Sequence, residues 1–406
     1  MPNMIENTEK REGENGEIQD NNISNKSINR CEMILSMEDT ISTEDNYILG
    51  ICGTQSEPEF RICAALSDYS CVVYNVGEQL SKILKLDHNT SPIVGVKFCN
   101  GSKNILYTAT KHGSITACDL RAKGKPVAEL KDNSSEGKLK PLASFDISCD
   151  DRLVAAGTEH IGGDAFILFW DIRFNNSKFD SKNNLLGGYW ESHMDDVTSL
   201  AFHCEKENVL ASGSTDGLIN IFDLTQTTED SALNYSLNTE SSVDRVGWLE
   251  DGNIWCTTHT HSFQMWKCED ASPFIKYNRS CIANFLVSLL NEDPDSCYLV
   301  KMNKSESIDH SFLLTGSSSV KGENLSGVIV NSDGMEICYD FIGNKQIVRD
   351  SWLHSKSGCM ITGGESSILN LWKQSPESLS IPRHSERKSI AKSNGKARDK
   401  HRTKPY

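Results

Sequence analysis

Short apolar runs separated by polar turns recur along most of the chain. The clearest example is residues 210–223, where a run of small and apolar residues leads into the polar turn Asp216-Gly217. After this turn, Ile219 and Ile221 alternate with their neighbours in the two-residue period of a β-strand. Asp and Gly are typical of the turns that separate strands. The pattern therefore predicts short strands joined by tight turns.

One unit of this pattern repeats. It consists of an apolar run, a strand of small residues, a polar turn, and an alternating strand that closes on an aromatic residue followed by Asp, or on substitutes for them. Successive units end 42 to 64 residues apart, and propeller repeats take roughly 40–45 residues, the excess being loop. The seven unit ends lie near residues 75, 119, 171, 223, 267, 331 and 373. Seven units of four short strands predict an all-β fold, a seven-bladed propeller.

Two local patterns refine this prediction. Residues 154–157 and 361–364 are apolar and small, as expected where blades crowd a central axis. Residues 279–290 place apolar side chains at helical spacing and are followed by Pro294, which predicts a short helix. We interpret this helix as a packing insert, with a docking helix as the alternative.

Residues 45–374 resemble the WD-repeat family. The residues that carry the resemblance include Phe169-Trp-Asp-Ile-Arg173 and Ser192-His-Met-Asp-Asp-Val197, and the middle of the chain is similar to one subgroup of that family. The resemblance implies a protein-interaction scaffold without catalytic activity, which binds other proteins on one face of the propeller. It also implies ring closure by a strand from the N-terminus, for which we expect residues 31–37 to supply the outer strand of the last blade.

The chain divides into three parts in this interpretation. Residues 1–30 are polar and acidic and residues 375–406 are polar and basic, with few aromatic side chains, so both termini are expected to be disordered. Residues 31–374 form the propeller.

A hydrogen-bond network is implied in the fourth blade by the same resemblance. It would join His193, Ser212 or Ser214, and Asp216, with Phe222 in the place of a tryptophan that could donate. Ser, His and Asp also occur together in nucleophilic catalysis. We favour the structural role, because these residues stand at repeat positions where buried polar groups need partners. We therefore assign no catalytic residues.

Most of the candidate partner-binding residues lie just before and after His193. Tyr189 and Trp190 are expected in a loop on the binding face, where aromatic side chains are good interface anchors; packing against their own blade is the alternative. Asp195, Asp196 and Asp244 stand where innermost strands begin. They predict an acidic rim that favours basic segments of partner proteins, unless they are merely solvated loop charges.

A second binding role comes from a tetrapeptide. Trp170, Asp171 and Arg173 match the Trp-Asp-any-Arg ending of WD proteins that serve as substrate receptors of cullin-4 ubiquitin ligases, and residues 118–121 are a weaker copy. The same tetrapeptide occurs in WD repeats without that role, where the Arg caps the blade edge or pairs with a neighbour.

Composition limits the remaining classes. Fourteen cysteines are present, but no two lie within three residues of each other, so no metal site and no cofactor are expected. The sequence lacks an apolar run of ~20 residues and an apolar leader, and we expect an intracellular protein of the nucleus, the cytoplasm or both, with no membrane partner. The net charge is −15, yet residues 382–406 carry nine basic and two acidic residues. Contact with nucleic acid is therefore expected only through this tail, if at all.

Deletion of residues 382–406 tests the expected role of the tail. Dispersed basic residues on a flexible segment can be recognised by the nuclear import machinery, so a fluorescent fusion without the tail should become more cytoplasmic. A full-length variant with the nine basic residues changed to Gln should behave in the same way. An unchanged distribution of both variants would leave the tail as a solubilising segment.

Overall fold

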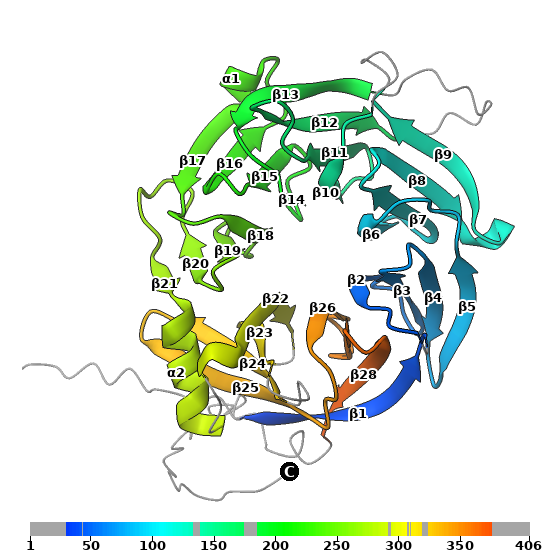
Figure 1. Ribbon diagram of the computed structural model, residues 1–406, viewed down its shortest axis with the longest axis vertical. Helices are drawn as coiled ribbons and strands as arrows, with labels where there is room; N and C mark the ends of the chain where they lie inside the picture. The colour runs from blue at the N-terminus through cyan, green and yellow to red at the C-terminus, as the bar shows by residue number, and fades with distance from the viewer. Residues whose placement is uncertain are drawn as a thin grey trace, which may run out of the picture.

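The computed structural model describes residues 30–42, 44–132, 139–173, 185–290, 294–306, 308, 310–318 and 324–375. Small β-sheets follow one another around a central axis and form a ring (Figure 1). The termini expected to be disordered are residues 1–30 and 375–406, and of these only Arg30 and Ser375 lie within the described residues.

Five of the sheets have four strands each. Their strands are β2 (Ile48–Gly53), β3 (Phe60–Leu66), β4 (Cys71–Val76) and β5 (Leu80–Leu86) in blade 1; β6 (Ile93–Cys99), β7 (Ser102–Thr110), β8 (Ser114–Asp119) and β9 (Lys125–Lys131) in blade 2; β10 (Leu142–Ile147), β11 (Leu153–Thr158), β12 (Ala165–Asp171) and β13 (Leu185–His193) in blade 3; β14 (Ser199–Phe202), β15 (Val209–Gly213), β16 (Leu218–Asp223) and β17 (Leu233–Asn238) in blade 4; and β18 (Val243–Trp248), β19 (Ile254–Thr258), β20 (Phe263–Trp266) and β21 (Ile275–Tyr277) in blade 5.

The sixth sheet has eight strands and comprises two blades joined edge to edge. Blade 6 consists of β22 (Cys297–Ser305), β23 (His310–Ser317), β24 (Leu325–Asn331) and β25 (Gly334–Ile342); blade 7 consists of β26 (Val348–Leu353), β27 (Met360–Gly364), β28 (Ile368–Gln374) and β1 (Cys31–Thr40). The strands among the described residues thus form seven groups of four. The all-β propeller class predicted from the sequence is confirmed.

Strand β1 closes the ring. It pairs antiparallel with β28, from Met33 opposite Gln374 to Thr40 opposite Ile368, which confirms the prediction that residues 31–37 form the outer strand of the last blade. The first half of β1 also pairs in parallel with β25, with Ile34 opposite Ile342. One strand therefore covers the outer edges of two blades, and edges covered in this way cannot pair with another chain.

The helices are short and lie outside the ring of strands. They are α1 (Glu229–Ala232), α2 (Arg279–Leu290) and the 3₁₀ turns η1 (Leu120–Ala122) and η2 (Pro294–Ser296). The bounds of α2 match the predicted helix. Asn278 Oδ1 accepts a hydrogen bond from the backbone N–H of Cys281 at the start of α2, and Ile282 and Leu286 pack against the cluster between blades 5 and 6. The packing role of α2 is thereby confirmed.

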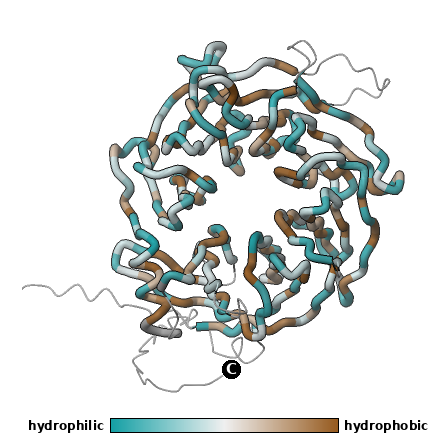
Figure 2. Tube along the Cα trace, in the orientation of Figure 1, coloured by the Kyte–Doolittle hydropathy of each residue, from teal (hydrophilic) through white to brown (hydrophobic). Residues whose placement is uncertain are grey.

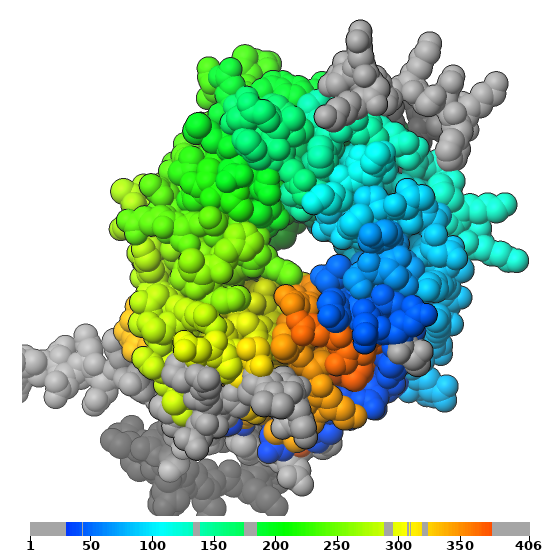
Figure 3. All heavy atoms as spheres, in the orientation of Figure 1, coloured from blue at the N-terminus to red at the C-terminus, as the bar shows by residue number. Residues whose placement is uncertain are grey.

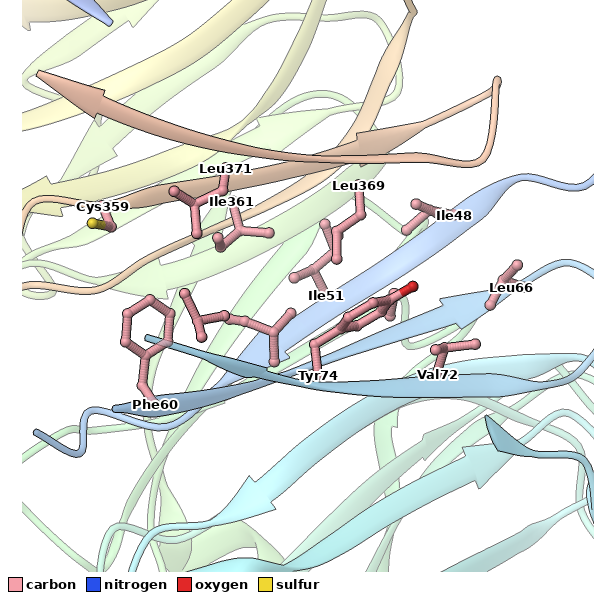
Figure 4. Packing of buried hydrophobic residues seen from close by; sticks show 13 residues of the cluster. Ile48, Ile51, Phe60, Leu66, Val72, Tyr74, Cys359, Ile361, Leu369 and Leu371 are labelled. Atoms are coloured by element: carbon pink, nitrogen blue, oxygen red, sulfur yellow. The ribbon is translucent and has the colours of Figure 1, made fainter. Parts of the chain in front are cut away.

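Apolar side chains fill the spaces between adjacent blades, and apolar stretches recur in every blade between more hydrophilic turns (Figure 2). Between blades 7 and 1, Ile48 and Tyr74 face Ile361, Leu369 and Leu371 (Figure 4). These five side chains are at most 1% exposed, so each loses most of its contact with water when the ring closes.

Close to the axis the blades leave no room for a side chain at one repeated position. A Cβ atom on Gly157, Gly213 or Gly363 would lie 2.5–2.7 Å from the side chain that starts the next blade, Val197, Val243 or Ile48 respectively. Because interiors are packed as densely as organic crystals, such contacts cannot be absorbed without displacement. The small residues seen in the sequence are thus a steric requirement of the ring.

Two buried carboxylates bond the innermost strands across blade boundaries. Asp350 on β26 accepts hydrogen bonds from the backbone N–H of Ile51 in blade 1 at 2.7 Å and from Arg245 in blade 5 at 3.0 Å, and Lys301 in blade 6 lies 2.8 Å away. Burial would raise the pKa of Asp350, but Lys301 and Arg245 outweigh it and hold this pKa below its ordinary value. Asp350 thus connects blade 7 with blades 1, 5 and 6.

The ring has a central opening, which is visible in the space-filling view (Figure 3). On the other side of this opening from Asp350, Asp146 on β10 likewise bonds neighbouring blades. It accepts a hydrogen bond from the backbone N–H of Phe202 in blade 4 at 2.8 Å and pairs with Lys97 of blade 2. Buried charged groups need hydrogen-bond or ion-pair partners, and both carboxylates have such partners on other blades.

Truncation of the N-terminus tests the closure. Removing residues 1–25 leaves β1 intact and should not change the melting temperature. Removing residues 1–40 exposes the edges of β25 and β28 and deletes Met33, which is 1% exposed. The expected loss in the free energy of unfolding exceeds the ~1.5–3 kcal/mol that burial of one such side chain contributes. Equal melting temperatures of the two truncated chains would refute closure by β1.

Candidate functional site

The predicted network around His193 is present where blade 3 passes to blade 4. His193 ends β13 and is 1% exposed. Its Nδ1 lies 2.9 Å from Asp216 Oδ2, and its Nε2 lies 2.7 Å from Ser212 Oγ. Asp216 stands in the turn between β15 and β16, so the network ties the end of blade 3 to the turn of blade 4.

The partners of the ring fix its tautomer. An ionised carboxylate only accepts, so Nδ1 carries the proton and donates to Asp216, and Nε2 accepts from the Ser212 hydroxyl. Asn220 Nδ2 also points at Nε2, at 3.4 Å, while donating to the carbonyl of Ser192 at 2.7 Å. Burial alone would raise the pKa of Asp216, but the hydrogen bond from His193 keeps it below its ordinary value.

This arrangement has the connectivity of a catalytic triad without an accessible nucleophile. Ser212 is 0% exposed, and a substrate carbonyl must reach the hydroxyl for acyl transfer to occur. The three side chains instead satisfy one another in a buried place.

Ser214, the alternative member of the network, has a different task. Its Oγ donates to the carbonyl of Asp195 at 2.9 Å and accepts from the backbone N–H of Asp216 at 3.1 Å. Ser214 therefore shapes the turn that presents Asp216, and Ser212 is the serine that contacts the histidine.

In the described parts of blades 5 and 7, only fragments of such a network are present. In blade 7, Trp372 Nε1 donates to Thr362 Oγ1 at 2.8 Å, and in blade 5 Trp266 Nε1 donates to Gln264 Oε1 at 3.0 Å. Gln264 Nε2 donates to the carbonyl of Thr239, as Asn220 does to Ser192. Blades 5 and 7 thus pair the indole N–H of a buried tryptophan with a side chain of the same blade.

Tyr189 and Trp190 do not lie in a loop, as the sequence analysis expected, but on the outer strand β13. The Tyr189 ring packs between Phe169 and Phe222, with both ring centroids at 4.9 Å, and burial raises the pKa of Tyr189 to about 12. The loop prediction was wrong because β13 continues, past a register shift against β12, as far as His193. Tyr189 is therefore a packing residue between blades 3 and 4.

Trp190 is 41% exposed but is held from several sides. Its ring lies against Phe166, with centroids 5.1 Å apart, and 5.4 Å from the Lys140 ammonium, which pairs with the buried Asp132. Its backbone N–H donates to Glu229 at 2.6 Å. Trp190 thus packs on its own blade and is only partly exposed to solvent.

The acidic residues lie along one continuous rim of hydrogen-bonded loops. The backbone N–H of His160 donates to Asp196 Oδ1 at 2.7 Å, and the carbonyl of Asp196 accepts from the N–H of Thr215 at 3.0 Å. Ser242 Oγ then donates to the carbonyl of Thr215 at 2.9 Å. This rim runs from blade 3 over blade 4 to blade 5, where Asp244 lies near His259.

Within the rim, Asp195 is exposed and Asp196 and Asp244 are half-buried. Asp244 accepts a hydrogen bond from Thr257 Oγ1 at 3.2 Å. Among the residues that the structure describes, no lysine or arginine forms an ion pair with any of these three carboxylates.

Sequence reasoning missed the apolar part of this rim. Met194 is 74% exposed and Ile161 is 36% exposed. Ala165 pairs with His193, and Ile161 bridges to Asp164, so the residues next in the chain, Asp164 and Met194, lie at the same end of blade 3. The sequence signal that could have indicated this apolar surface is Met194, an apolar residue between His193 and the acidic Asp195. We name Ile161, Asp164, Met194, Asp195 and Asp196 the blade 3–4 patch.

The tetrapeptide that matches the ligase receptors, residues 170–173, lies at the end of strand β12. Trp170 is 1% exposed and packs in the cluster between blades 2 and 3. Arg173 is exposed, and its Nε donates to both oxygens of Asp171, at 2.9 and 3.0 Å. Arg121 binds Asp119 in the same way one blade earlier. The structure brings Asp171 and Arg173 together as neighbours that pair.

No helix in the described part of the chain is long and apolar enough to cross a membrane. Across the same residues, no three His, Cys, Asp or Glu side chains gather as ligands for a metal ion.

Comparison with known proteins finds similarity to WD repeat-containing proteins. No family model matches it. A WD repeat-containing protein of Saccharomyces cerevisiae is 27% identical over 318 residues, which cover 76% of this chain and 74% of the relative. One of Arabidopsis thaliana is 32% identical over 175 residues, 42% of this chain and 40% of the relative. The WD repeat-containing protein 89 homolog of Dictyostelium discoideum is 22% identical over 227 residues, 53% and 59% of the two chains.

The substitution Asp216→Ala tests the structural role of the network. It leaves the buried His193 Nδ1–H without an acceptor, which should cost ~1–3 kcal/mol of unfolding free energy. Asp223→Ala is the matched control, because this carboxylate caps the exposed end of β16 through Thr225; it should cost less than about 0.5 kcal/mol. Chemical denaturation measures both. Loss of partner binding by Asp216→Ala with unchanged stability would show a functional residue instead.

Proposed function

We propose that this β-propeller, whose curated relatives are WD repeat-containing proteins, binds a partner protein through the blade 3–4 patch. WD-repeat propellers generally bind other proteins and are generally non-enzymatic scaffolds. The observation that carries the proposal is the presence of two exposed apolar side chains, Met194 and Ile161, in this patch. The carboxylates of the patch, on Asp164, Asp195 and Asp196, form no ion pair with a lysine or arginine among the described residues.

The chemistry of the patch favours a basic segment with an apolar side chain. The flexible Met194 side chain adapts to an irregular partner surface, and burial of exposed apolar area is the main favourable contribution to association. The carboxylates of Asp164, Asp195 and Asp196 favour lysine or arginine and oppose acidic partners, which selects the partner and accelerates its encounter. Asp244 would extend the same preference towards blade 5.

Hydrogen bonds hold the loops of the blade 3–4 patch in place. Asp196 accepts a hydrogen bond from the turn that carries Ile161, and Met194 N–H donates to Asp216 Oδ2 at 3.1 Å. The His193 network therefore positions the loop that presents Met194 and Asp195. A surface held in place before binding loses less conformational entropy when the partner binds.

The role of a cullin-4 substrate receptor, through Trp170, Asp171 and Arg173, is the weaker proposal. Arg173 is exposed and could contact an adaptor, but its guanidinium is already paired with Asp171. Arg121 and Asp119 form the same pair without the tryptophan. Copurification of the ligase's propeller adaptor with the wild type, and its loss on Arg173→Ala, would establish this role in place of the first.

Charge reversal at Asp195 tests the proposed binding surface. Proteins retained by the immobilised wild-type chain should be lost with Asp195→Lys, and binding should weaken as salt rises, because screening acts beyond roughly 8–10 Å. Met194→Ala should weaken binding of the same proteins by ~2 kcal/mol, as for an interface anchor. The control is Asp230→Lys, an equal change of charge on the exposed face of α1, which should retain them. Retention by Asp195→Lys and Met194→Ala would refute the proposal.

A further inference from the structure

Two buried histidines occupy equivalent turns in blades 4 and 7. His203 follows β14, and its backbone N–H donates to the carbonyl of Val209 across the turn at 2.9 Å. His354 follows β26, and its N–H donates in the same way to the carbonyl of Cys359 at 2.9 Å. The side chains of His203 and His354 belong to residues that are 3% and 2% exposed. The repeat therefore places an imidazole inside the same turn of two blades.

In both turns the Nδ1 atom of the ring accepts hydrogen bonds from backbone amides. His203 Nδ1 accepts from the N–H of Glu205 at 3.1 Å and from that of Lys206 at 3.2 Å. His354 Nδ1 accepts from the N–H of Ser357 at 3.2 Å, and Ser357 Oγ lies 2.8 Å away. A backbone N–H can only donate, so Nδ1 carries no proton and each ring is neutral, with its proton on Nε2. Protonation of Nδ1 would turn the acceptor into a donor that faces these N–H groups.

The corresponding turn of blade 3 is held without a titratable side chain. Ser148 follows β10, and its N–H donates to the carbonyl of Leu153 at 2.9 Å. Its Oγ accepts from the N–H of Arg152 at 3.2 Å and from that of Leu153 at 2.9 Å. A serine hydroxyl does not change its charge in the pH range in which histidine does. Acid therefore removes the side-chain acceptor of this turn in blades 4 and 7 but not in blade 3.

Each imidazole also packs against the next blade of the ring. His203 lies against Trp248 of blade 5, with ring centroids 4.8 Å apart. His354 is stacked on Phe60 of blade 1, with ring centroids 4.5 Å apart and an interplanar angle of 16°. The two turns thus lie at blade boundaries, and the second lies at the seam where the ring closes.

Burial is the largest influence on the His203 imidazole, and it lowers the pKa of this group. The Lys206 ammonium in the same turn acts in the same direction, whereas the Glu205 carboxylate opposes it. From blade 5 the ring faces Trp248, which carries no charge. The surroundings of His203 therefore favour its neutral form.

Burial likewise lowers the pKa of His354. Glu57 of blade 1 and Glu306 of blade 6 oppose this effect, and Lys356 of the same turn adds to it. Lys356 Nζ lies 3.2 Å from Glu57 Oε2, so the charges of these two side chains partly cancel at the ring.

We propose that protonation of His203 and His354 at Nδ1 is a pH-dependent switch that loosens the boundaries between blades 4 and 5 and between blades 7 and 1. The proton comes from water, and each charged ring loses its bonds to the backbone amides of its turn.

The direction of the effect follows from proton binding. Because both histidines have a lower pKa in the folded chain than in the unfolded chain, where it is about 6.5, the unfolded chain binds more protons below this pH. The stability contributed by the two neutral rings is therefore complete above a pH of about 6.5 and is lost progressively below it.

The switch acts on the frame of the ring. Strand β14 begins shortly after Asp196 and ends at Phe202, just before His203, so the turn of His203 lies at the opposite end of this strand from the blade 3–4 patch. Acidification would loosen the blade boundaries without protonating a group of the patch. This inference does not depend on the identity of the binding partner.

Hydrogen–deuterium exchange of the full-length wild type, read residue by residue at pH ~7.5 and pH ~5.5 on either side of the ordinary histidine pKa, tests the switch. Rates are corrected for the intrinsic effect of pH on exchange. The amides of Lys206 and Ser357, which bind the imidazoles, should lose protection at the lower pH. The amide of Leu153, which binds Ser148, is the internal control and should keep its protection.

Substitution by asparagine separates the charge from the hydrogen bond, because its amide oxygen accepts but does not titrate. The urea midpoint of unfolding should fall between the two pH values in the wild type, and should fall less in the chain that carries both His203→Asn and His354→Asn. His112→Asn, in an exposed turn, is the matched control and should lose as much as the wild type. Each variant is first shown to melt cooperatively at the higher pH.

The inference is overturned if the Lys206 and Ser357 amides of the wild type keep their protection at the lower pH as the Leu153 amide does. It is equally overturned if the folded double variant loses as much stability on acidification as the wild type. Should the double variant fail to melt cooperatively, the exchange of the wild-type amides decides.

Discussion

The pairing of β1 with both β28 and β25 is the constraint on which the rest of the structure depends. Residues 31–40 are joined to strands roughly 300 residues later, so the entropy cost of this closure is offset only when the whole ring is in place. The seam between blades 7 and 1 adds the apolar cluster around Ile48, the hydrogen bond from Tyr74 to Asp39 at 2.6 Å, and that from Ile51 N–H to Asp350.

Closure of the ring explains how blades with such different sequences can share one architecture. Among the described residues, a bonded histidine, serine and aspartate occur together in blade 4, as His193, Ser212 and Asp216. Blades 5 and 7 each have a hydrogen bond from a buried tryptophan. What remains common is the packing near the axis, where Gly157, Gly213 and Gly363 admit the side chain that starts the next blade. The loops of the blade 3–4 patch rest on this frame, with Asp216 as the link between the buried network and the exposed Met194.

The sequence predicted the parts of the fold that repeat. Alternating strands, polar turns and small residues are local signals that predicted the propeller, and apolar residues at helical spacing predicted α2. The closing strand and the network of His193 with Asp216 were implied by the resemblance to the WD-repeat family. Tyr189 and Trp190 were misplaced because an outer strand is only partly buried, and its register shift against β12 leaves no regular apolar pattern.

Pairings between distant residues escaped sequence reasoning for a different reason. Asp350 and Arg245 are 105 residues apart, and a single charge in an innermost strand does not reveal its partner. The exposure of Met194 and Ile161 likewise depends on how two loops from different parts of blade 3 end side by side. Such features become visible only after the ring is assembled.

Hydrogen–deuterium exchange of the backbone amides tests the central claim most directly, since exchange rates report the opening of each strand. If β1 closes the ring, the paired amides of β1, β25 and β28 should exchange at one common rate. This rate should be as slow as that of the amides of the innermost strands. Rapid exchange of β1 while β28 stays protected would contradict closure, because the ring would then be stable with its seam open.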